Sequence, residues 1–223
     1  MSDMNQALPT QNMEINIGPS HPAMHGTVKI VVELDGETIV KSDTDVGYLH
    51  RGFEKMCENV TWAQCMPYTD RLNYVSPLIN NFAFCQAVER LLGIEIPERA
   101  KYIRVIAAEI SRITDHITCC AAMGMEVGGF TPFLYMIEGR DYLYDLVERL
   151  TGARITVNYA RIGGVADDLP ENFAEDCLVT LDKVFKLIDD GEKMLTRNRI
   201  FIDRMNGVGK ISAEDALNYG ITG

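Results

Sequence analysis

The stretch PERAKYIRVIAAEISRITDHITCCAAM, residues 97–123, decides the fold of this chain. Isoleucine recurs along it at steps of three and four residues, at positions 103, 106, 110, 113 and 117. This spacing places the isoleucines on one face of a helix, and a proline at the first position suits a helix start. The stretch therefore predicts a long amphipathic helix whose isoleucine face lies in a core.

The same helix carries a polar face. Glu109, Arg112 and His116 follow each other at i, i+3 and i+7, so neighbours on this face can pair. On the surface such pairs contribute only a few tenths of a kcal/mol each, and in a buried place they would matter more.

Further helices are predicted on both sides of this one. Upstream, helical periodicity covers residues 53–66, ending before Pro67, and then runs from Asn73 to Leu92, where Gly93 stops it.

Downstream, a Thr-Pro start opens a helix over 131–150 that ends at Gly152. An irregular connection at 154–165 leads to an amphipathic helix over 172–196, and Ser212 caps a short last helix. The expected buried stripe of the 172–196 helix consists of Phe173, Leu178, Leu181, Val184, Phe185 and Ile188.

The N-terminal part reads differently. Alternating apolar residues predict β-strands at 13–19 and 27–34, and an Asp-Gly turn at 35–36 precedes a third strand at 38–42. The fold class is therefore α+β, with a small N-terminal antiparallel β element followed by a bundle of long helices.

Three regions are expected: a flexible arm over 1–12, the β element over 13–45 and the helical bundle over 46–223. The formal net charge of −11 excludes a nucleic-acid footprint. The least polar stretch, 117–130, is too short for a membrane span and is interrupted by Glu126, and residues 1–11 lack the apolar region of a signal peptide.

The six cysteines form no CxxC pair, so small core residues are expected at these positions rather than metal ligands. Two of the four histidines lie in one loop, HPAMHG at 21–26, between two predicted strands. Pro22 and Gly26 rule out the helical His-x3-His metal arrangement, and no third ligand is nearby. The two histidines either belong to an ordinary turn, or they shape the loop and contact a ligand. In the second case an imidazole can exchange a proton with the ligand near neutral pH.

Two more stretches concentrate polar groups. YLHRGFE at 48–54 places an arginine at a helix start, either as a solvated charge or near an anionic or electron-rich group. YTDRLNY at 68–74 ends on Tyr74. The side chain of Tyr74 either packs in the core as a core-filler residue or donates a hydrogen bond to a carbonyl group. Double glycines at 128–129 and 163–164 would let backbone approach a ligand closely, but neither is a GxGxxG, so no dinucleotide site is predicted.

Taken together these motifs are specific. In order they are GPSHPAMHG (18–26), GYLHRGFEK (47–55), PYTDRLNY (67–74), AVERLLG (87–93), RVIAAEISRITDH (104–116), GGFTPF (128–133) and NYARIGGVADDLP (158–170). The chain resembles the N-terminal half of the D subunit family of proton-pumping NADH:quinone oxidoreductase (respiratory complex I), which is related to nickel–iron hydrogenase large subunits. The resemblance implies a hydrogenase-large-subunit-like fold.

The resemblance implies a peripheral subunit on the cytoplasmic face of the bacterial inner membrane, inactive in isolation. It would form part of a quinone headgroup pocket next to the terminal iron–sulfur cluster of a partner subunit. No cofactor would be bound by this chain; the substrate would be menaquinone or ubiquinone. Expected partners are the terminal-cluster subunit, a neighbouring subunit of the peripheral arm and the quinone-channel membrane subunit, while NADH oxidation and proton pumping belong to other subunits.

The resemblance also assigns residues. It implies that His25 and Tyr74 contact the quinone headgroup as catalytic residues, with Met24 beside them in the binding site. Glu126 and His21 would form a proton relay.

Arg51 and Thr156 would lie near the partner's iron–sulfur cluster. Thr156 stands where mitochondrial-type members have a histidine, which predicts a weaker pH dependence of the cluster potential and a low-potential quinone such as menaquinone. Glu126 stands in MEVG where many members have an aspartate, which changes the geometry of its pairing with His25.

The nickel motif RxCxxC of hydrogenases aligns with Arg71, Asn73 and Ser76, so the two thiolates are missing and hydrogenase activity is excluded. Two alternatives remain: a catalytically silent structural or assembly paralogue, and the equivalent subunit of a ferredoxin- or F420-linked quinone-reducing complex. A half-length bundle would leave helix faces uncovered, so the isolated chain is expected to be poorly soluble or oligomeric.

Overall fold

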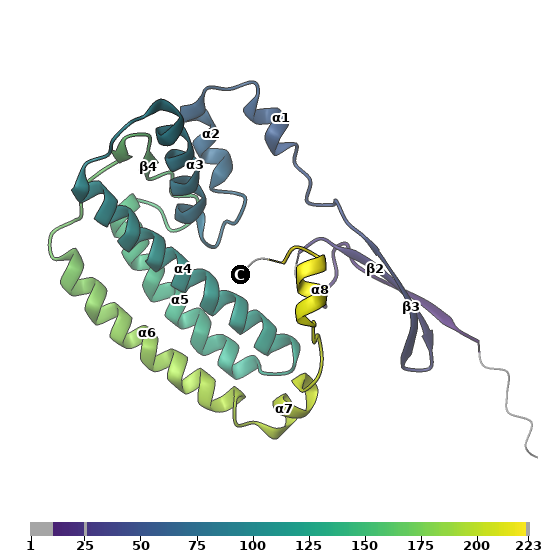
Figure 1. The fold of residues 1–223 in the computed structure, drawn as a ribbon. Coiled ribbons are helices and arrows are strands. Elements are labelled where there is room, and N and C mark those ends of the chain that lie inside the picture. The colour runs from purple at the N-terminus through teal and green to yellow at the C-terminus, as the bar shows by residue number, and fades with distance from the viewer. Residues whose placement is uncertain (1–10, 25, 222–223) are drawn as a thin grey trace, which may run out of the picture. The chain divides into compact units, whose positions relative to one another are not determined.

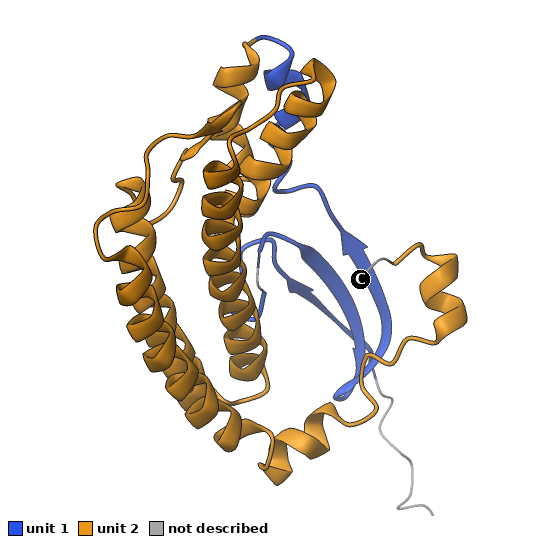
Figure 2. Ribbon diagram, turned by 60° about the vertical axis from the view of Figure 1, so that its left-hand side comes forward, with its two compact units in different colours: residues 1–59 blue, residues 60–223 orange. Residues whose placement is uncertain are grey.

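The computed structural model describes residues 11–24 and 26–221. The chain divides into two compact units, residues 1–59 and 60–223 (Figure 2). Most of the predicted 1–12 arm lies outside the described residues.

The first unit is built on a three-stranded antiparallel sheet in the order β1-β2-β3. Its strands are β1 (Met13–Ile17), β2 (Lys29–Asp35) and β3 (Thr38–Asp45), and a short helix α1 (Phe53–Cys57) follows. The antiparallel β element predicted from the alternation is confirmed, with Met13 opposite Leu34 and Ile17 opposite Ile30. Among the described residues of this unit only Val32 is buried, so the sheet has almost no core of its own.

Strand β1 ends two residues earlier than its sequence predicts, and Gly18 is the reason. Gly18 has φ +100°, and a Cβ atom there would lie 1.9 Å from the Val28 carbonyl oxygen. Only glycine fits this close approach, which turns the chain out of the strand.

The second unit is a layer of long helices (Figure 1). In chain order it contains α2 (Trp62–Thr69), α3 (Pro77–Leu92), α4 (Glu98–Glu126), α5 (Phe130–Thr151), α6 (Phe173–Leu195), α7 (Arg199–Met205) and α8 (Ala213–Asn218). Helix α5 packs against both α4 and α6, and α3 packs between α2 and α4. A small hairpin, β4 (Ala160–Arg161) and β5 (Gly164–Val165), lies on α3 and α4. Among the described residues no helix is long and apolar enough to cross a membrane.

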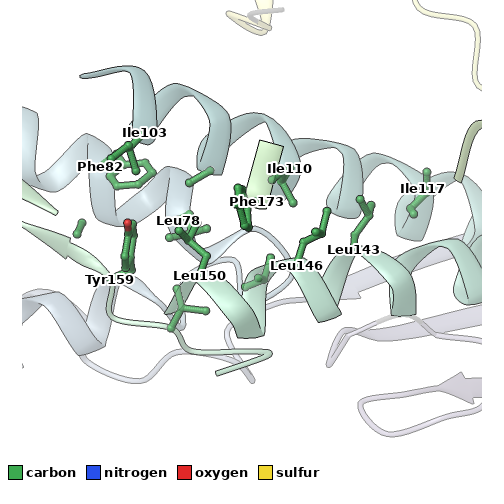
Figure 3. Packing of buried hydrophobic residues seen from close by; sticks show 14 of the residues in the cluster. Leu78, Phe82, Ile103, Ile110, Ile117, Leu143, Leu146, Leu150, Tyr159 and Phe173 are labelled. Carbon is green, nitrogen blue, oxygen red and sulfur yellow. The ribbon is translucent and has the colours of Figure 1, made fainter. Parts of the chain in front are cut away.

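The core of this unit lies where α3, α4 and α5 meet (Figure 3). Ile103, Ile110 and Ile117 of α4 are buried, which confirms the isoleucine face, although Ile106 is 37% exposed. Their buried partners include Leu78, Phe82, Leu143, Leu146, Leu150, Tyr159 and Phe173.

Two of the predicted helices differ from the structure, the first in its continuity and the second in its start. The expected helix over 53–66 is two helices, because a new one begins after Thr61, whose backbone N–H donates to Oε1 of Gln64 at 3.0 Å in a capping box. Pro67 lies inside α2 instead of after its end. The helix expected from Asn73 begins at Pro77, because Asn73 and Ser76 close a turn through a backbone hydrogen bond of 3.2 Å.

The predicted buried stripe of α6 is partly wrong. Phe173 and Val184 are buried, but Leu178 is 66% and Phe185 55% exposed, so most of each of these two residues is left uncovered in the described chain. Of the cysteines expected in the core, Cys65 and Cys85 are buried, whereas the adjacent Cys119 and Cys120 are exposed on α4.

Candidate functional site

Tyr74 lies on the turn that joins α2 to α3 in the second unit. Its side chain is 63% exposed, which excludes the core-filler interpretation. Ser76, two residues later, is only 3% exposed and is the N-cap residue of α3. The turn therefore presents a tyrosine to the outside while its other end is anchored in the unit.

Asp115 of α4 holds this turn. Its Oδ2 atom accepts a hydrogen bond from Asn73 Nδ2 at 3.1 Å and another from Ser76 Oγ at 3.2 Å. Asn73 Nδ2 also donates to Ser76 Oγ at 2.8 Å. Asn73 and Ser76 thus bond to each other and to a carboxylate.

Tyr144 of α5 lies beside this cluster. Its side chain is buried, and Arg140 and Arg154 lie 5.4 and 5.9 Å from the centre of its ring. Burial raises the pKa of Tyr144; the two arginines oppose the shift, and Tyr74 and Asp115 add to it. The charges of Tyr74 and Asp115 thus act on the Tyr144 hydroxyl, whose pKa lies above its usual value.

Thr156 lies on the loop between α5 and the β4–β5 hairpin. It has φ 56°, an uncommon conformation for a threonine, and its hydroxyl donates to the Ile155 carbonyl oxygen at 2.6 Å. Two residues later the Asn158 N–H donates to Oδ2 of Asp70 at 3.2 Å. Asp70 directly follows α2 and is 1% exposed, and burial raises the pKa of its carboxyl.

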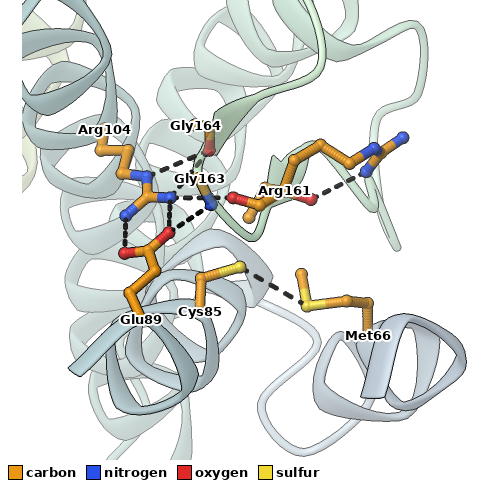
Figure 4. Close-up of polar contacts among 8 residues, drawn as sticks. Met66, Cys85, Glu89, Arg104, Arg161, Gly163 and Gly164 are labelled. Carbon is orange, nitrogen blue, oxygen red and sulfur yellow. Dashed lines mark hydrogen bonds and ion pairs between the residues drawn. The ribbon is translucent and has the colours of Figure 1, made fainter. Parts of the chain in front are cut away.

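A buried ion pair that no sequence motif indicated fixes the other end of this loop (Figure 4). Glu89 of α3 and Arg104 of α4 form two hydrogen bonds of 2.6 and 2.9 Å, with side chains 6% and 4% exposed. Arg104 also donates to the carbonyl oxygens of Arg161 and Gly164, and Glu89 accepts from the Gly163 N–H at 2.7 Å. The backbone of the double glycine at 163–164 therefore forms hydrogen bonds with the Glu89–Arg104 ion pair, and the close approach predicted for a ligand is made by these two side chains.

A signal for Glu89 is nevertheless present in the sequence. Leu78, Phe82, Cys85 and Glu89 follow each other at steps of four, three and four residues, so they share one helix face. Three of these are apolar and buried, which predicts that the fourth is buried and paired.

Glu126 is the exposed last residue of α4. It is eleven residues beyond Asp115, which corresponds to about 16 Å along a helix, so the structure does not bring it to Tyr74. The glycines that follow allow close packing: a Cβ on Gly128 would lie 2.6 Å from Arg204 Nη1, and one on Gly129 would lie 2.7 Å from Leu195 Cδ2. They form one wall of a pocket of about 640 Å³ between the start of α5 and α7.

The first unit carries the remaining predicted residues. His21 is exposed, its Nδ1 accepts from the Ala23 N–H at 3.1 Å, and its carbonyl oxygen accepts from the Met24 N–H at 3.0 Å. These bonds give His21 a part in shaping the loop. Met24 is partly buried and Arg51 is exposed. His25 lies outside the described residues.

The comparisons with known proteins agree with one another. The family model "Respiratory-chain NADH dehydrogenase, 49 Kd subunit" matches residues 126–223. The D subunit of NADH-quinone oxidoreductase from Myxococcus xanthus is 58% identical over 222 residues, which is 100% of this chain and 54% of that protein.

A D subunit of NADH-quinone oxidoreductase from Anaeromyxobacter dehalogenans is 58% identical over 216 residues, covering 97% of this chain and 50% of that protein. The corresponding protein of Akkermansia muciniphila is 49% identical over 213 residues, covering 96% of this chain and 51% of that protein. The chain spans about half the length of the curated relatives that it matches.

Proposed function

Because this chain belongs to the 49 kDa family, the D subunits of NADH-quinone oxidoreductase, we propose that it forms part of the quinone headgroup site of a respiratory complex I. The observation that carries this proposal is Tyr74: a tyrosine hydroxyl on a turn anchored by Asp115, open to a ligand from outside the unit. His25 is proposed as the second headgroup contact, together with Met24, the residue before it in the sequence.

Reduction of a quinone to a quinol needs two electrons and two protons. A phenol that donates a hydrogen bond to a quinone carbonyl stabilises the negative charge that develops on this oxygen as electrons arrive. The electrons come from the iron–sulfur cluster of a partner subunit, so this chain needs no cofactor of its own. Its part is to bind and orient the headgroup and to supply proton donors.

Glu126 and His21 are proposed as a proton relay, and Arg51 and Thr156 as neighbours of the partner's cluster. A cation near a cluster favours its reduced form, and Thr156 offers no titratable group there. We therefore infer a cluster potential with little pH dependence and a low-potential quinone, menaquinone. A cluster midpoint that falls steeply with pH in a redox titration would contradict this.

The assembled enzyme is proposed to contain the terminal-cluster subunit, a neighbouring peripheral-arm subunit and a quinone-channel membrane subunit, and to sit at the cytoplasmic face of the bacterial inner membrane. NADH oxidation and proton translocation are proposed to occur outside this chain, in other subunits of the complex. The electron donor is encoded elsewhere, so a ferredoxin- or F420-linked complex would use the same quinone-site residues.

Tyr74→Phe in the assembled complex tests the proposal. Removing the hydroxyl removes one hydrogen bond to the headgroup, so the KM for a short-chain quinone rises about tenfold, as expected for a bond worth about 1.4 kcal/mol. NADH oxidation with ferricyanide, which bypasses the quinone site, stays unchanged.

Tyr102→Phe, on an equally exposed tyrosine of α4, is the matched control and leaves quinone reduction unchanged. If Tyr74→Phe also behaves like the unmodified enzyme in a normally assembled complex, the headgroup role is wrong. The chain would then be the structural or assembly paralogue that the substitution of glutamate for aspartate at Glu126 allows.

A further inference from the structure

The turn that carries Tyr74 is attached at both of its ends to one carboxylate. Asp115 Oδ2 accepts from Asn73, directly before Tyr74, and from Ser76, two residues after it, at 3.1 and 3.2 Å. We propose that Asp115 is a positioning residue for Tyr74: it fixes this turn on α4 so that the Tyr74 hydroxyl meets the quinone carbonyl. The proposal rests on the headgroup role of Tyr74.

Tyr74 is not fixed by its own packing. Its side chain is 63% exposed, and its place is therefore set by the backbone on either side. Besides the bonds to Asp115, the turn is closed by Ser76 N to Asn73 O at 3.2 Å and Asn73 Nδ2 to Ser76 Oγ at 2.8 Å. Without the carboxylate the link from Asn73 to Ser76 would keep its internal bonds and lose both of these hydrogen bonds to α4.

The anchor lies next to buried residues of α4. The neighbours of Asp115 in α4, Thr114 and Ile117, are 1% and 6% exposed, and the Thr114 hydroxyl donates to the Ile110 carbonyl oxygen at 2.8 Å. The acceptor of the turn is therefore mounted on the central helix of the unit. A displacement of a donor by about 1 Å is enough to weaken a reaction about a hundredfold, which is why such an anchor matters.

The bonds that Asp115 accepts come from neutral groups. Its hydrogen-bond donors in the described part of the chain are an amide and a hydroxyl, whereas Glu89 has a guanidinium. A neutral acceptor of the same shape can take these bonds too. The positioning role therefore predicts that Asp115→Asn keeps the hydrogen bonds to the turn and the KM for quinone, whereas Asp115→Ala loses the bonds and raises the KM.

The test uses the assembled complex with Asp115→Ala, Asp115→Asn and the exposed Asp182→Ala on α6 as the matched control. Asp115→Ala raises the KM for a short-chain quinone about tenfold, with a smaller fall in kcat and no change in ferricyanide reduction. Asp115→Asn stays within about twofold of the unmodified enzyme, and Asp182→Ala leaves it unchanged. Combined with Tyr74→Phe, Asp115→Ala adds no further loss, because both changes remove the same contact.

The outcomes separate the two proposals. If Tyr74→Phe raises the KM and Asp115→Ala does not, the positioning role is wrong and the headgroup role stands. If Asp115→Asn is as damaging as Asp115→Ala, the charge of Asp115 is what counts and positioning is overturned. If Tyr74→Phe has no effect, both proposals fall.

A second variant tests the proposal if the Asp115→Ala complex assembles poorly. Asn73→Ala removes one of the two attachments without altering α4, and it raises the quinone KM several-fold in a complex with normal cluster content. An unchanged KM in Asn73→Ala would overturn the proposal.

Discussion

Two buried carboxylates, Asp70 and Glu89, hold the same loop but respond to burial in opposite ways. Asp70 is 1% and Glu89 5% exposed, and each accepts a backbone N–H of the loop, from Asn158 and Gly163 respectively. Burial raises the pKa of Asp70, whereas the hydrogen-bonded Arg104 guanidinium lowers the pKa of Glu89. Burial alone opposes the charged form, and a bidentate cation reverses the sign.

The difference predicts opposite contributions to stability. The lowered pKa of Glu89 gives stability that is present above the pKa of the unfolded chain and is lost as the pH falls through the folded pKa. The raised pKa of Asp70 costs stability above the unfolded pKa, and this cost disappears as the pH falls. Substitutions that remove the cation beside Glu89 or the charge of Asp70 test this difference in stability.

The largest effect is expected for Arg104→Met. The change leaves Glu89 buried without its cation and removes the donor to the carbonyl oxygens of Arg161 and Gly164. Breaking a buried pair in this way costs about 3–5 kcal/mol of unfolding free energy. Urea unfolding of the purified chain, followed by the fluorescence of its single tryptophan, Trp62, and by helical circular dichroism, measures the loss.

Glu89→Gln is the control for Arg104→Met, because it keeps the acceptor for Gly163 and removes only the charge. It should lose less stability, and it should lack the part of the acid-induced loss of stability that comes from the lowered pKa of Glu89. Equal midpoints for Arg104→Met and the unmodified chain near neutral pH would show that the buried pair contributes nothing net.

Asp70→Asn should act in the other direction. The amide keeps an acceptor for the Asn158 N–H while removing a buried charge, so the unfolding free energy near pH 7 rises on the order of 1 kcal/mol. The gain should shrink as the pH is lowered, because Asp70 itself becomes neutral in the folded chain. Urea midpoints at several pH values measure it.

Asp70→Ala is the control for this second prediction, since it removes both the charge and the acceptor and should destabilise the chain. A gain for Asp70→Asn that grows toward low pH would contradict the raised pKa of Asp70.

The sequence predicts the regular elements better than the contacts between them. The isoleucine periodicity predicts α4 because a long amphipathic helix carries many repeats of one pattern. It fails for Leu178 and Phe185 of α6, because periodicity finds an apolar face but not whether another element covers it. The sequence does not predict the break before α2, because the signal for it is a single capping box, Thr61 with Gln64, inside a stretch with helical periodicity.

The candidate site divides in the same way. Tyr74 follows from its motif, but its anchor Asp115 is 42 residues from Asn73 and 39 from Ser76, so no local pattern joins them. Burial of Glu89 was readable from its helix face, whereas its pairing with Arg104 depends on how α3 and α4 pack. The sequence thus predicts which residues of one helix or turn are buried or exposed. Which residues of different helices form hydrogen bonds or ion pairs can be read only from the folded structure.

The smallest effect on unfolding free energy is expected for Arg154→Ala. This substitution tests whether the number of ionic partners or their burial decides the contribution of an ion pair. Arg154 pairs with three carboxylates of α5, on Asp141, Asp145 and Glu148, so it has more ionic partners than Arg104. Its side chain is 40% exposed, however, and water and salt screen its pairs. The urea midpoint of Arg154→Ala should therefore stay close to that of the unmodified chain, and any difference should vanish in about 1 M salt. A loss as large as that of Arg104→Met would mean that the number of partners, and not burial, decides what an ion pair contributes in this unit.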